Sequence, residues 1–312
     1  FTQNFTTATD TFNVAIGHDA GTLVTTGVQN TFIGGLAGDA NTTAGNNTAV
    51  GYSSLSANTT GTSNSAVGAF SLLSNTTGNQ NTAIGQNSLD ANTTAADNTA
   101  VGFSALGANT TGTLNTAMGA GALDANTTAN DNTGIGAASM GGNTTGTRNT
   151  AVGSDSLKVS TTGNDNTAIG KGALTANTTA SNNTAVGKNS LTTNTTGANN
   201  TSVGKDALLS NTTGANNTAL GFAALDAAIL PSSNTSIGSA SLSVNVHSSR
   251  NTAVGSNSLE SHNLGSAGNG LNTAVGYNSG LAVTTGIENT LMGALAGDAL
   301  TDADFNVAVG YQ

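Results

Sequence analysis

A motif that returns at every seventeenth position constrains this chain more than any other feature. The motif Asn-Thr-Ala-Val-Gly, or a close variant, starts at Asn47 and recurs at this interval as far as Asn251. Earlier copies at Asn13 and Asn30 keep the phase, and the step from Asn251 to Asn272 is longer by four positions. Such a period predicts a solenoid, in which no repeat can bury its apolar side chains alone and each stacks on its neighbours.

The repeat reads Asn-Thr-Ala-Val-Gly-x-x-(Ser/Ala)-Leu-x-x-Asn-Thr-Thr-Gly-x-x. Position four is aliphatic or Met throughout, and position nine is Leu or Met in thirteen consecutive coils from Leu55 to Leu259. Frequent β-branched residues, Asn and Gly exclude long helices and favour two or three short strands joined by tight corners. We therefore predict an all-β fold, a parallel β-solenoid (β-roll) of about 18 coils.

The strand Thr-Ala-Val should alternate between two faces. We expect the aliphatic residue at position four to point inward, with Thr at position two, and Ala at position three to point outward. Leu at position nine supplies a second inward row. The predicted core residues are Val50, Leu55, Val67, Leu72, Ile84, Leu89, Val101 and Leu106.

The corners of the coil have their own signals. Gly at position five predicts a positive φ angle. Asn at positions one and twelve predicts amide ladders, in which each side chain bonds to its equivalent one coil away. At about 4.8 Å per coil, 18 coils would give a rod on the order of 85 Å long.

One repeat array is expected to fill the chain. We predict a single solenoid domain over residues 1–312, with the insertion in the coil 256–271, as a piece of a longer fibre. Ser261–Gly270 is the one irregular projection, so it is our candidate for a specific contact.

Charge excludes several functions. The net charge is −10 and only 7% of residues are charged, so there is no basic footprint for nucleic acid. No apolar run approaches the ~20 residues of a membrane-spanning helix, so we expect no membrane insertion. There is no Cys, which excludes disulfides and thiolate metal sites.

Small residues suggest self-association. Ala at position three and Ala or Ser at position eight would form flat faces on which backbones could approach closely. We therefore predict a homo-oligomer or filament, with a trimer as the leading form.

Two strings in the repeat carry a resemblance to known families. Asn47–Tyr52 and Asn272–Tyr277 read Asn-Thr-Ala-Val-Gly-Tyr, and Asn58–Gly61 and Asn75–Gly78 read Asn-Thr-Thr-Gly. This pattern resembles phage tail-fibre-like and bacterial surface repeat proteins, and is similar to the β-roll heads of trimeric autotransporter adhesins. The resemblance implies a left-handed, trimeric β-roll on a fibre that projects from a cell or virion.

Ten Asn-Thr-Thr sequons predict N-glycosylation at an exposed corner, unless these residues only shape the corner. The candidate sites are Asn41, Asn58, Asn75, Asn92, Asn109, Asn126, Asn143, Asn177, Asn194 and Asn211.

Position six offers candidate contacts. Lys171, Lys188 and Lys205 fall there in three successive coils, which suggests either an anionic partner or a solvated edge. Aromatic residues at the same position could stack on sugars of a cell-surface glycan; they are Tyr52, Phe103, Phe222, Tyr277 and Tyr311.

No enzyme site is predicted. The acids at positions ten and seventeen, such as Asp90 and Asp97, should face different ways. His247, His262 and Glu260 lie near one another only through the irregular coil, which is weak support for a metal site. We expect no catalytic residue, no metal and no cofactor.

These features together favour a structural role. The leading hypothesis is the shaft or body of an extracellular, cell-surface or virion fibre that spaces or displays a binding tip. The alternative is a glycosylated or glycan-binding adhesin that contacts partners through its lateral face. A third interpretation is an ice-binding solenoid, but each Thr-Thr pair presents only one Thr outward.

Overall fold

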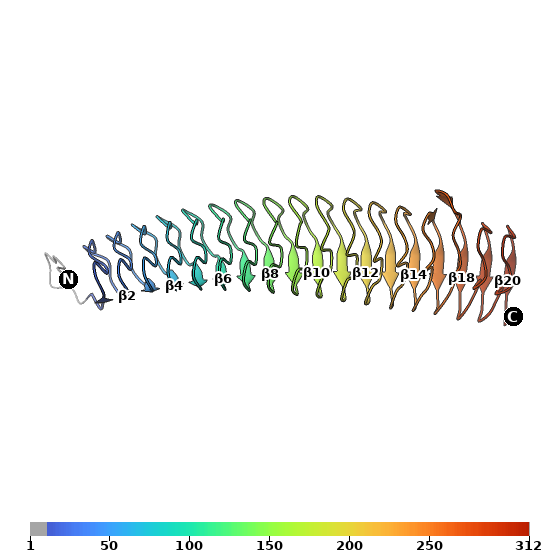
Figure 1. The fold of residues 1–312 in the computed structure, drawn as a ribbon, viewed down its shortest axis with the longest axis horizontal. Coiled ribbons are helices and arrows are strands. Elements are labelled where there is room, and N and C mark those ends of the chain that lie inside the picture. The colour runs from blue at the N-terminus through green and yellow to red at the C-terminus, as the bar shows by residue number, and fades with distance from the viewer. Residues whose placement is uncertain (1–10, 312) are drawn as a thin grey trace. The chain divides into compact units, whose positions relative to one another are not determined.

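The computed structural model describes residues 11–311, which form an all-β parallel β-solenoid with one repeat of the sequence motif in each coil (Figure 1). The predicted fold class is confirmed. The chain divides into two compact units, Phe1–Asn149 and Thr150–Gln312. The left-handed coil sense and the joining of both units into one array stay predictions. Among the described residues no helix is long and apolar enough to span a membrane.

Each strand of the main sheet covers positions two to four of its coil. In the first unit the strands are β1 (Val14–Ile16), β2 (Thr31–Ile33), β3 (Thr48–Val50), β4 (Ser65–Val67), β5 (Thr82–Ile84), β6 (Thr99–Val101), β7 (Thr116–Met118) and β8 (Thr133–Ile135).

The second unit repeats the arrangement and adds two short strands at the insertion. Its strands are β9 (Thr150–Val152), β10 (Thr167–Ile169), β11 (Thr184–Val186), β12 (Thr201–Val203), β13 (Thr218–Leu220), β14 (Thr235–Ile237), β15 (Ser248–Ser249), β16 (Thr252–Val254), β17 (Gly268–Asn269), β18 (Thr273–Val275), β19 (Thr290–Met292) and β20 (Val307–Val309).

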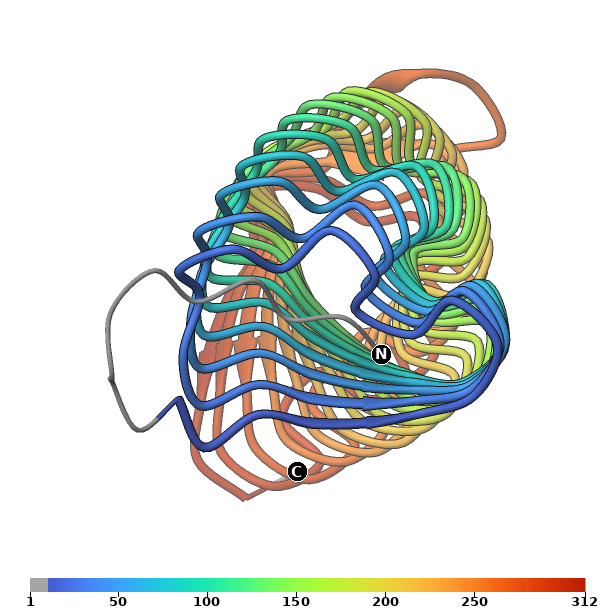
Figure 2. The ribbon, with the colours of Figure 1, turned by 90° about the vertical axis from the view of Figure 1, so that its left-hand side faces the viewer.

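Strand pairing keeps every position above its equivalent. Within each unit, consecutive main-sheet strands pair in parallel, so that Ala83 lies opposite Ala100. The register survives the insertion, because Thr252 lies opposite Thr273. The extra residues leave the stack as a loop, seen in orange in Figure 2, and at its base β15 pairs with β17. The predicted insertion therefore projects without disturbing the sheet.

The core differs from our expectation in one respect. Leu55, Leu72, Leu89 and Leu106 at position nine are fully buried, as predicted. The partners that face them are the alanines at position three, which are also fully buried, as at Ala83.

The position-four part of the predicted core is therefore wrong. Val67 and Ile84 are 38% and 43% exposed, and Val50 and Val101 are half-buried. The middle residue of a three-residue strand faces opposite to its two neighbours. So short a coil encloses little space, and a methyl group opposite leucine fills it.

Two coils show that positions three and nine share one space. Where position nine is Gly38, position three is Phe32, and where it is Gly297, position three is Leu291. Both large residues are fully buried. A methyl group on Gly38 would lie 2.5 Å from the Phe32 ring, and one on Gly297 would lie 2.7 Å from Leu291. The same two side chains also reach the neighbouring coils, where position nine is Gly21 or Gly280 and position three is Ala: a methyl group would lie 2.8 Å from Phe32 on Gly21 and 2.7 Å from Leu291 on Gly280. Large and small residues thus exchange places with the core still filled.

Small residues at position eight are buried as well, including Ser54, Ser71 and Ala105. The flat outer faces that we expected from positions three and eight therefore do not exist. Any surface for self-association must lie elsewhere on the coil.

Glycine at position five is a stereochemical requirement. Its φ angle lies between 128° and 143° in every coil from Gly17 to Gly310, as predicted for this corner. A methyl group on Gly187 would lie 2.5 Å from the carbonyl oxygen of Gly204 in the next coil. No other residue type combines this backbone with so close an approach.

Asparagine at position one forms the ladder that the repeat predicts. The backbone N–H of Asn98 donates to Oδ1 of Asn81 at 3.1 Å, and Nδ2 of Asn98 donates to the carbonyl oxygen of Gly112 at 2.9 Å. Both asparagines are buried, so the bonds form away from water. Oδ1 of Asn98 in turn accepts from the backbone N–H of Asn115 at 3.0 Å, so each Asn ties its coil to the coils before and after it.

Candidate functional site

The outer face of the main sheet presents the same two positions of the repeat in every coil. It consists of position two, mostly Thr, and position four, always aliphatic or Met. We call the row at position four the aliphatic column. In the first unit it comprises Ile16, Ile33, Val50, Val67, Ile84, Val101, Met118 and Ile135, and in the second Val152, Ile169, Val186, Val203, Leu220, Ile237, Val254, Val275, Met292 and Val309.

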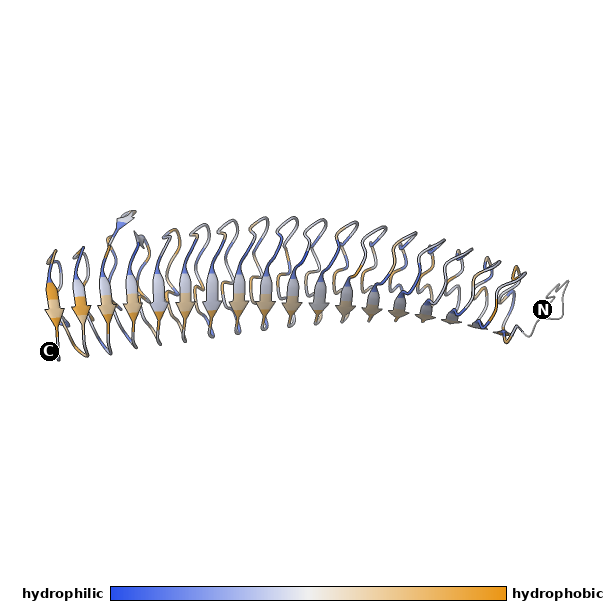
Figure 3. Ribbon diagram, turned by 180° about the vertical axis from the view of Figure 1, so that it is seen from behind, coloured by the Kyte–Doolittle hydropathy of each residue, from blue (hydrophilic) through white to orange (hydrophobic). Residues whose placement is uncertain are grey.

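The column is uncharged, and its residues are exposed in about half of the coils and half-buried in the others. Ile169, Leu220 and Met292 are 40%, 45% and 46% exposed. Positions one to five contain no acidic, basic or histidine residue in any coil. Figure 3 shows many of the strands turning toward the hydrophobic colour at their arrowheads, where position four lies. A long apolar row in water marks an interaction surface more often than an isolated exposed side chain does.

The sequons are not at an exposed corner. All ten of their asparagines are fully buried, so our expectation of accessible acceptor sites is wrong. Nδ2 of Asn92 donates to Oδ1 of Asn75 at 2.8 Å and to the carbonyl oxygen of Ala95 at 3.1 Å. A glycan on this nitrogen would replace one of these bonds and would have no room in the folded coil. Asn at position twelve is therefore a structural residue.

The two threonines of each sequon differ. The hydroxyl of Thr76 at position thirteen donates to the backbone carbonyl of Thr93 in the next coil at 3.1 Å. Thr77 at position fourteen is exposed. This coil thus presents mainly one Thr of the pair to solvent, as we expected from the alternation of side chains along a strand.

Lys205, the last of the three successive lysines at position six, is partly neutralised by its surroundings. Nζ of Lys205 lies 3.2 Å from Oδ2 of Asp206 and 5.2 Å from the centre of the Phe222 ring. Partial burial raises the pKa of Asp206, but hydrogen bonds from Asn189 and Lys205 outweigh it and leave this pKa below its ordinary value. An anionic partner at Lys171, Lys188 and Lys205 stays a prediction.

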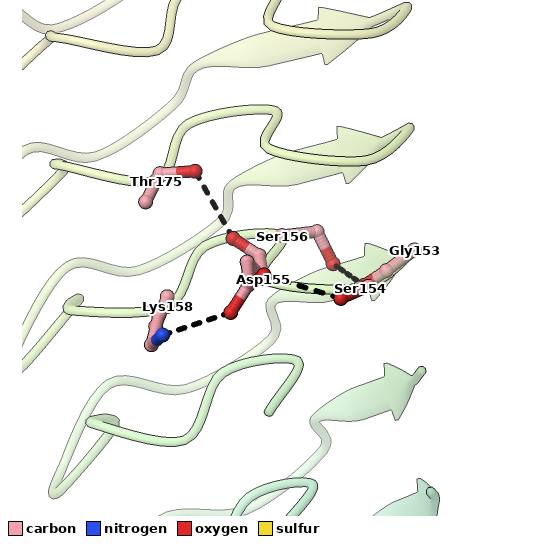
Figure 4. Close-up of polar contacts among 6 residues, drawn as sticks. All are labelled: Gly153, Ser154, Asp155, Ser156, Lys158 and Thr175. Atoms are coloured by element: carbon pink, nitrogen blue, oxygen red, sulfur yellow. Dashed lines mark hydrogen bonds and ion pairs between the residues drawn. The ribbon is translucent and has the colours of Figure 1, made fainter. Parts of the chain in front are cut away.

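A second polar group lies in the coil that precedes the one with Lys171 (Figure 4). Nζ of Lys158 donates to Oδ1 of Asp155 at 2.8 Å, and the Ser154 hydroxyl donates to Oδ2 at 3.1 Å. The hydrogen bond from Lys158 lowers the pKa of the Asp155 carboxyl. Thr175 of the next coil donates to the Asp155 backbone carbonyl at 3.1 Å. These contacts hold the corner rather than form a cleft.

Asp90 and Asp124 lie on either side of Gly107, a proximity that the sequence analysis did not predict. They occupy position ten in alternate coils, and a methyl group on Gly107 between them would lie 3.4 Å from Asp90 and 2.8 Å from Asp124. Partial burial raises the pKa of both carboxyls. Asp90 and Asp97, the pair weighed from the sequence, belong to one coil, whereas stacking brings together equal positions of different coils. Within residues 11–311 no group of three or more His, Cys, Asp or Glu could hold a metal ion.

His262 is a buried structural residue. It stands where most other coils have the buried Asn, and its Nε2 lies 2.8 Å from the Ser248 hydroxyl and 3.5 Å from Nδ2 of Asn272. Its Nδ1 has no hydrogen-bond partner. Burial lowers the pKa of His262 to about 4. Because Ser248 is also fully buried, this pair cannot act as a nucleophile and base on an external substrate.

The exposed aromatic residues at position six lie singly along the coils. Tyr52, Phe103, Phe222 and Tyr277 are each more than half exposed. Tyr52 also meets Phe70 edge to face with ring centres 5.5 Å apart. No two of the four belong to consecutive coils, so they do not form one stacking platform.

No protein-family model matches the chain, and no curated protein matches it. The case for function therefore rests on the geometry of the coil and on the motif resemblance.

Proposed function

We propose that this chain is the structural shaft or body of an extracellular or virion fibre, which spaces or displays a binding tip. The observation that carries the proposal is the bonding between equal positions of consecutive coils. Backbone pairing and the position-one ladder recur along both units, and the Thr hydroxyl row recurs in most coils. Such a unit resists local opening because each coil is bonded on both sides.

A spacer must have a length set by its coil number. Deleting Asn64–Arg148 removes five whole coils and keeps the phase, since Ser63 then joins Asn149. Electron microscopy should show folded particles shorter than the wild type by about 24 Å, at ~4.8 Å per coil. Compact particles of unchanged length, or an unfolded product, would sink the proposal.

Placement on a fibre outside the cell needs its own test. An antibody against this chain should label projecting fibres on the cell or particle that makes it. Label confined to the interior would reject the extracellular or virion location.

Glycan binding through the lateral face is the second candidate function. The exposed aromatic residues at position six and the neighbouring lysine rank favour it, because aromatic faces stack on sugars and cations bind acidic ones. A glycan array probed with the intact chain separates the two functions. A spacer binds no glycan, whereas an adhesin binds a defined set and loses it when Phe222 and Tyr277 are changed to Ala.

Self-association is part of the proposed role, with a trimer as the leading form. Fibre shafts gain stiffness and burial from neighbouring strands of the assembly. Ice binding is the third candidate function, and only the exposed Thr at position fourteen supports it. Thermal hysteresis of the purified chain tests it, and none is expected.

A further inference from the structure

We propose that copies of this chain associate through the outer face of the main sheet, with the aliphatic column of one copy packed against that of another. This inference rests on the proposed self-association and identifies its surface. The occupant of the face is a second copy of the same chain.

The extent of the face supports this proposal. Along the interior strands of the second unit, Ile169 and Leu220 retain 40% and 45% of their accessible surface, and the Thr row beside them is mostly half-exposed. With two outward residues in each of ten coils, the second unit presents about 20 residues on this face. That is within the ~20–30 residues which each partner gives to a standard interface.

The distribution of charge supports it as well. The chain carries a net charge of −10, which would repel a second copy if charged surfaces met. All charged residues lie outside positions one to five, so two copies meeting at this face bury no charge. The column residues are apolar and keep part of their surface in water, most of all at Ile169 and Leu220 among the interior strands, so covering them would be favourable.

The spacing of the column selects the partner. Parallel pairing keeps position four of each coil beside position four of the next, as at Ile169 and Val186. A partner that contacts the row throughout must present apolar groups at the same interval, about 4.8 Å. A second copy of this chain meets that condition, because it carries the same aliphatic column at the same coil spacing.

The first test compares two double variants by sedimentation equilibrium. Ile169→Lys with Leu220→Lys places two charges in the column, whereas Ser239→Lys with Ala294→Lys places the same charge at position six, where Lys171 and Lys188 occur naturally. The column variant should raise the dissociation constant at least 100-fold, and the control should change it less than about threefold. Circular dichroism should show both folded, because all four positions are at least partly exposed.

A milder pair guards against misfolding of the lysine variant. Ile169→Thr with Leu220→Thr places β-branched strand residues in the column and removes apolar surface. It should weaken association about tenfold and leave the thermal unfolding of the isolated chain nearly unchanged.

Cysteine cross-linking gives an independent readout, because the chain has no Cys. Val186→Cys in the column should give disulfide-linked copies under mild oxidation with copper phenanthroline, and Ser239→Cys should not. A wild-type chain that stays monomeric at millimolar concentration overturns self-association itself. Association that survives the column variants, or cross-linking only through Ser239→Cys, overturns this interface and leaves the proposed fibre role standing.

Discussion

His262 differs from its equivalents in other coils in being titratable while fully buried. Burial lowers its pKa from 6.5 to about 4, so the unfolded chain binds a proton at a higher pH than the folded chain does. The stability that depends on neutral His262 is fully present above pH 6.5 and is lost as the pH falls toward 4. The loss over this window is about 3 kcal/mol at most.

The prediction for His262 concerns the pH dependence of unfolding. Denaturant unfolding should show a free energy that falls between pH 6.5 and pH 5 in the wild type. His262→Asn restores the residue type of most other coils and should flatten this dependence. Equal slopes in wild type and variant would show that His262 is not the responsible group.

Glycine at position five gives a second prediction at this scale. Gly187→Ala should lower the free energy of unfolding by about 2 kcal/mol or more, because the left-handed backbone and the Gly204 carbonyl both oppose a Cβ. Ser239→Ala at the exposed position six is the control and should change it by less than about 0.5 kcal/mol. Urea titration of both variants measures the difference, and equal midpoints would refute the steric account.

Within a coil, the inward residues of positions three and nine share one cavity. Phe32→Ala should cost about 3 kcal/mol, since it empties space that Gly21 and Gly38 leave open. Adding Gly38→Leu should recover part of that loss, because Ala at three with Leu at nine is the pair used by most coils. Gly38→Leu alone should clash with the Phe32 ring. A double-mutant cycle by chemical denaturation measures the coupling, and additive costs would show that the two positions do not share the space.

Between coils, the position-twelve ladder has an interruption that can be repaired. Oδ1 of Asn211 has no hydrogen-bond partner, because the next coil has Ala228 at this position. Ala228→Asn should donate to that oxygen and raise the free energy of unfolding by about 1 kcal/mol. Ala227→Asn, one residue away and half-buried, is the matched control and should give no gain. Thermal unfolding of both variants decides the matter, and destabilisation by Ala228→Asn would contradict the ladder geometry.

The strands show why the sequence predicted the fold but not which side chains point into the coil. The period of the motif, the Gly corner and the Asn ladders all follow from the repeat and are observed. Hydrophobicity alone assigned Val67 and Ile84 to the core, yet the small coil leaves room for only Ala opposite Leu. Phe32 and Leu291, which stand at position three in two of the four coils with Gly at position nine, were the signal that position three points inward.

At the scale of the whole molecule, the repeat predicted more about stacking than about surface. It predicted a solenoid, and residues 11–311 form one within each of the two units. The predicted sites were less accurate, because the sequon asparagines are buried and the sequence analysis did not identify the apolar row at position four as a surface. Both errors come from the same cause, since a repeat fixes which positions stack but not which side of the strand faces the coil interior.

The central claim is that the stacked coils turn position three inward and position four outward. Cysteines placed singly at Thr167, Ala168 and Ile169 of β10 test it through their reaction with a thiol reagent at nanomolar protein concentration. We predict rapid labelling of Thr167→Cys and Ile169→Cys, and protection of Ala168→Cys until the chain unfolds. Rapid labelling at Ala168→Cys with protection at Ile169→Cys would contradict the account.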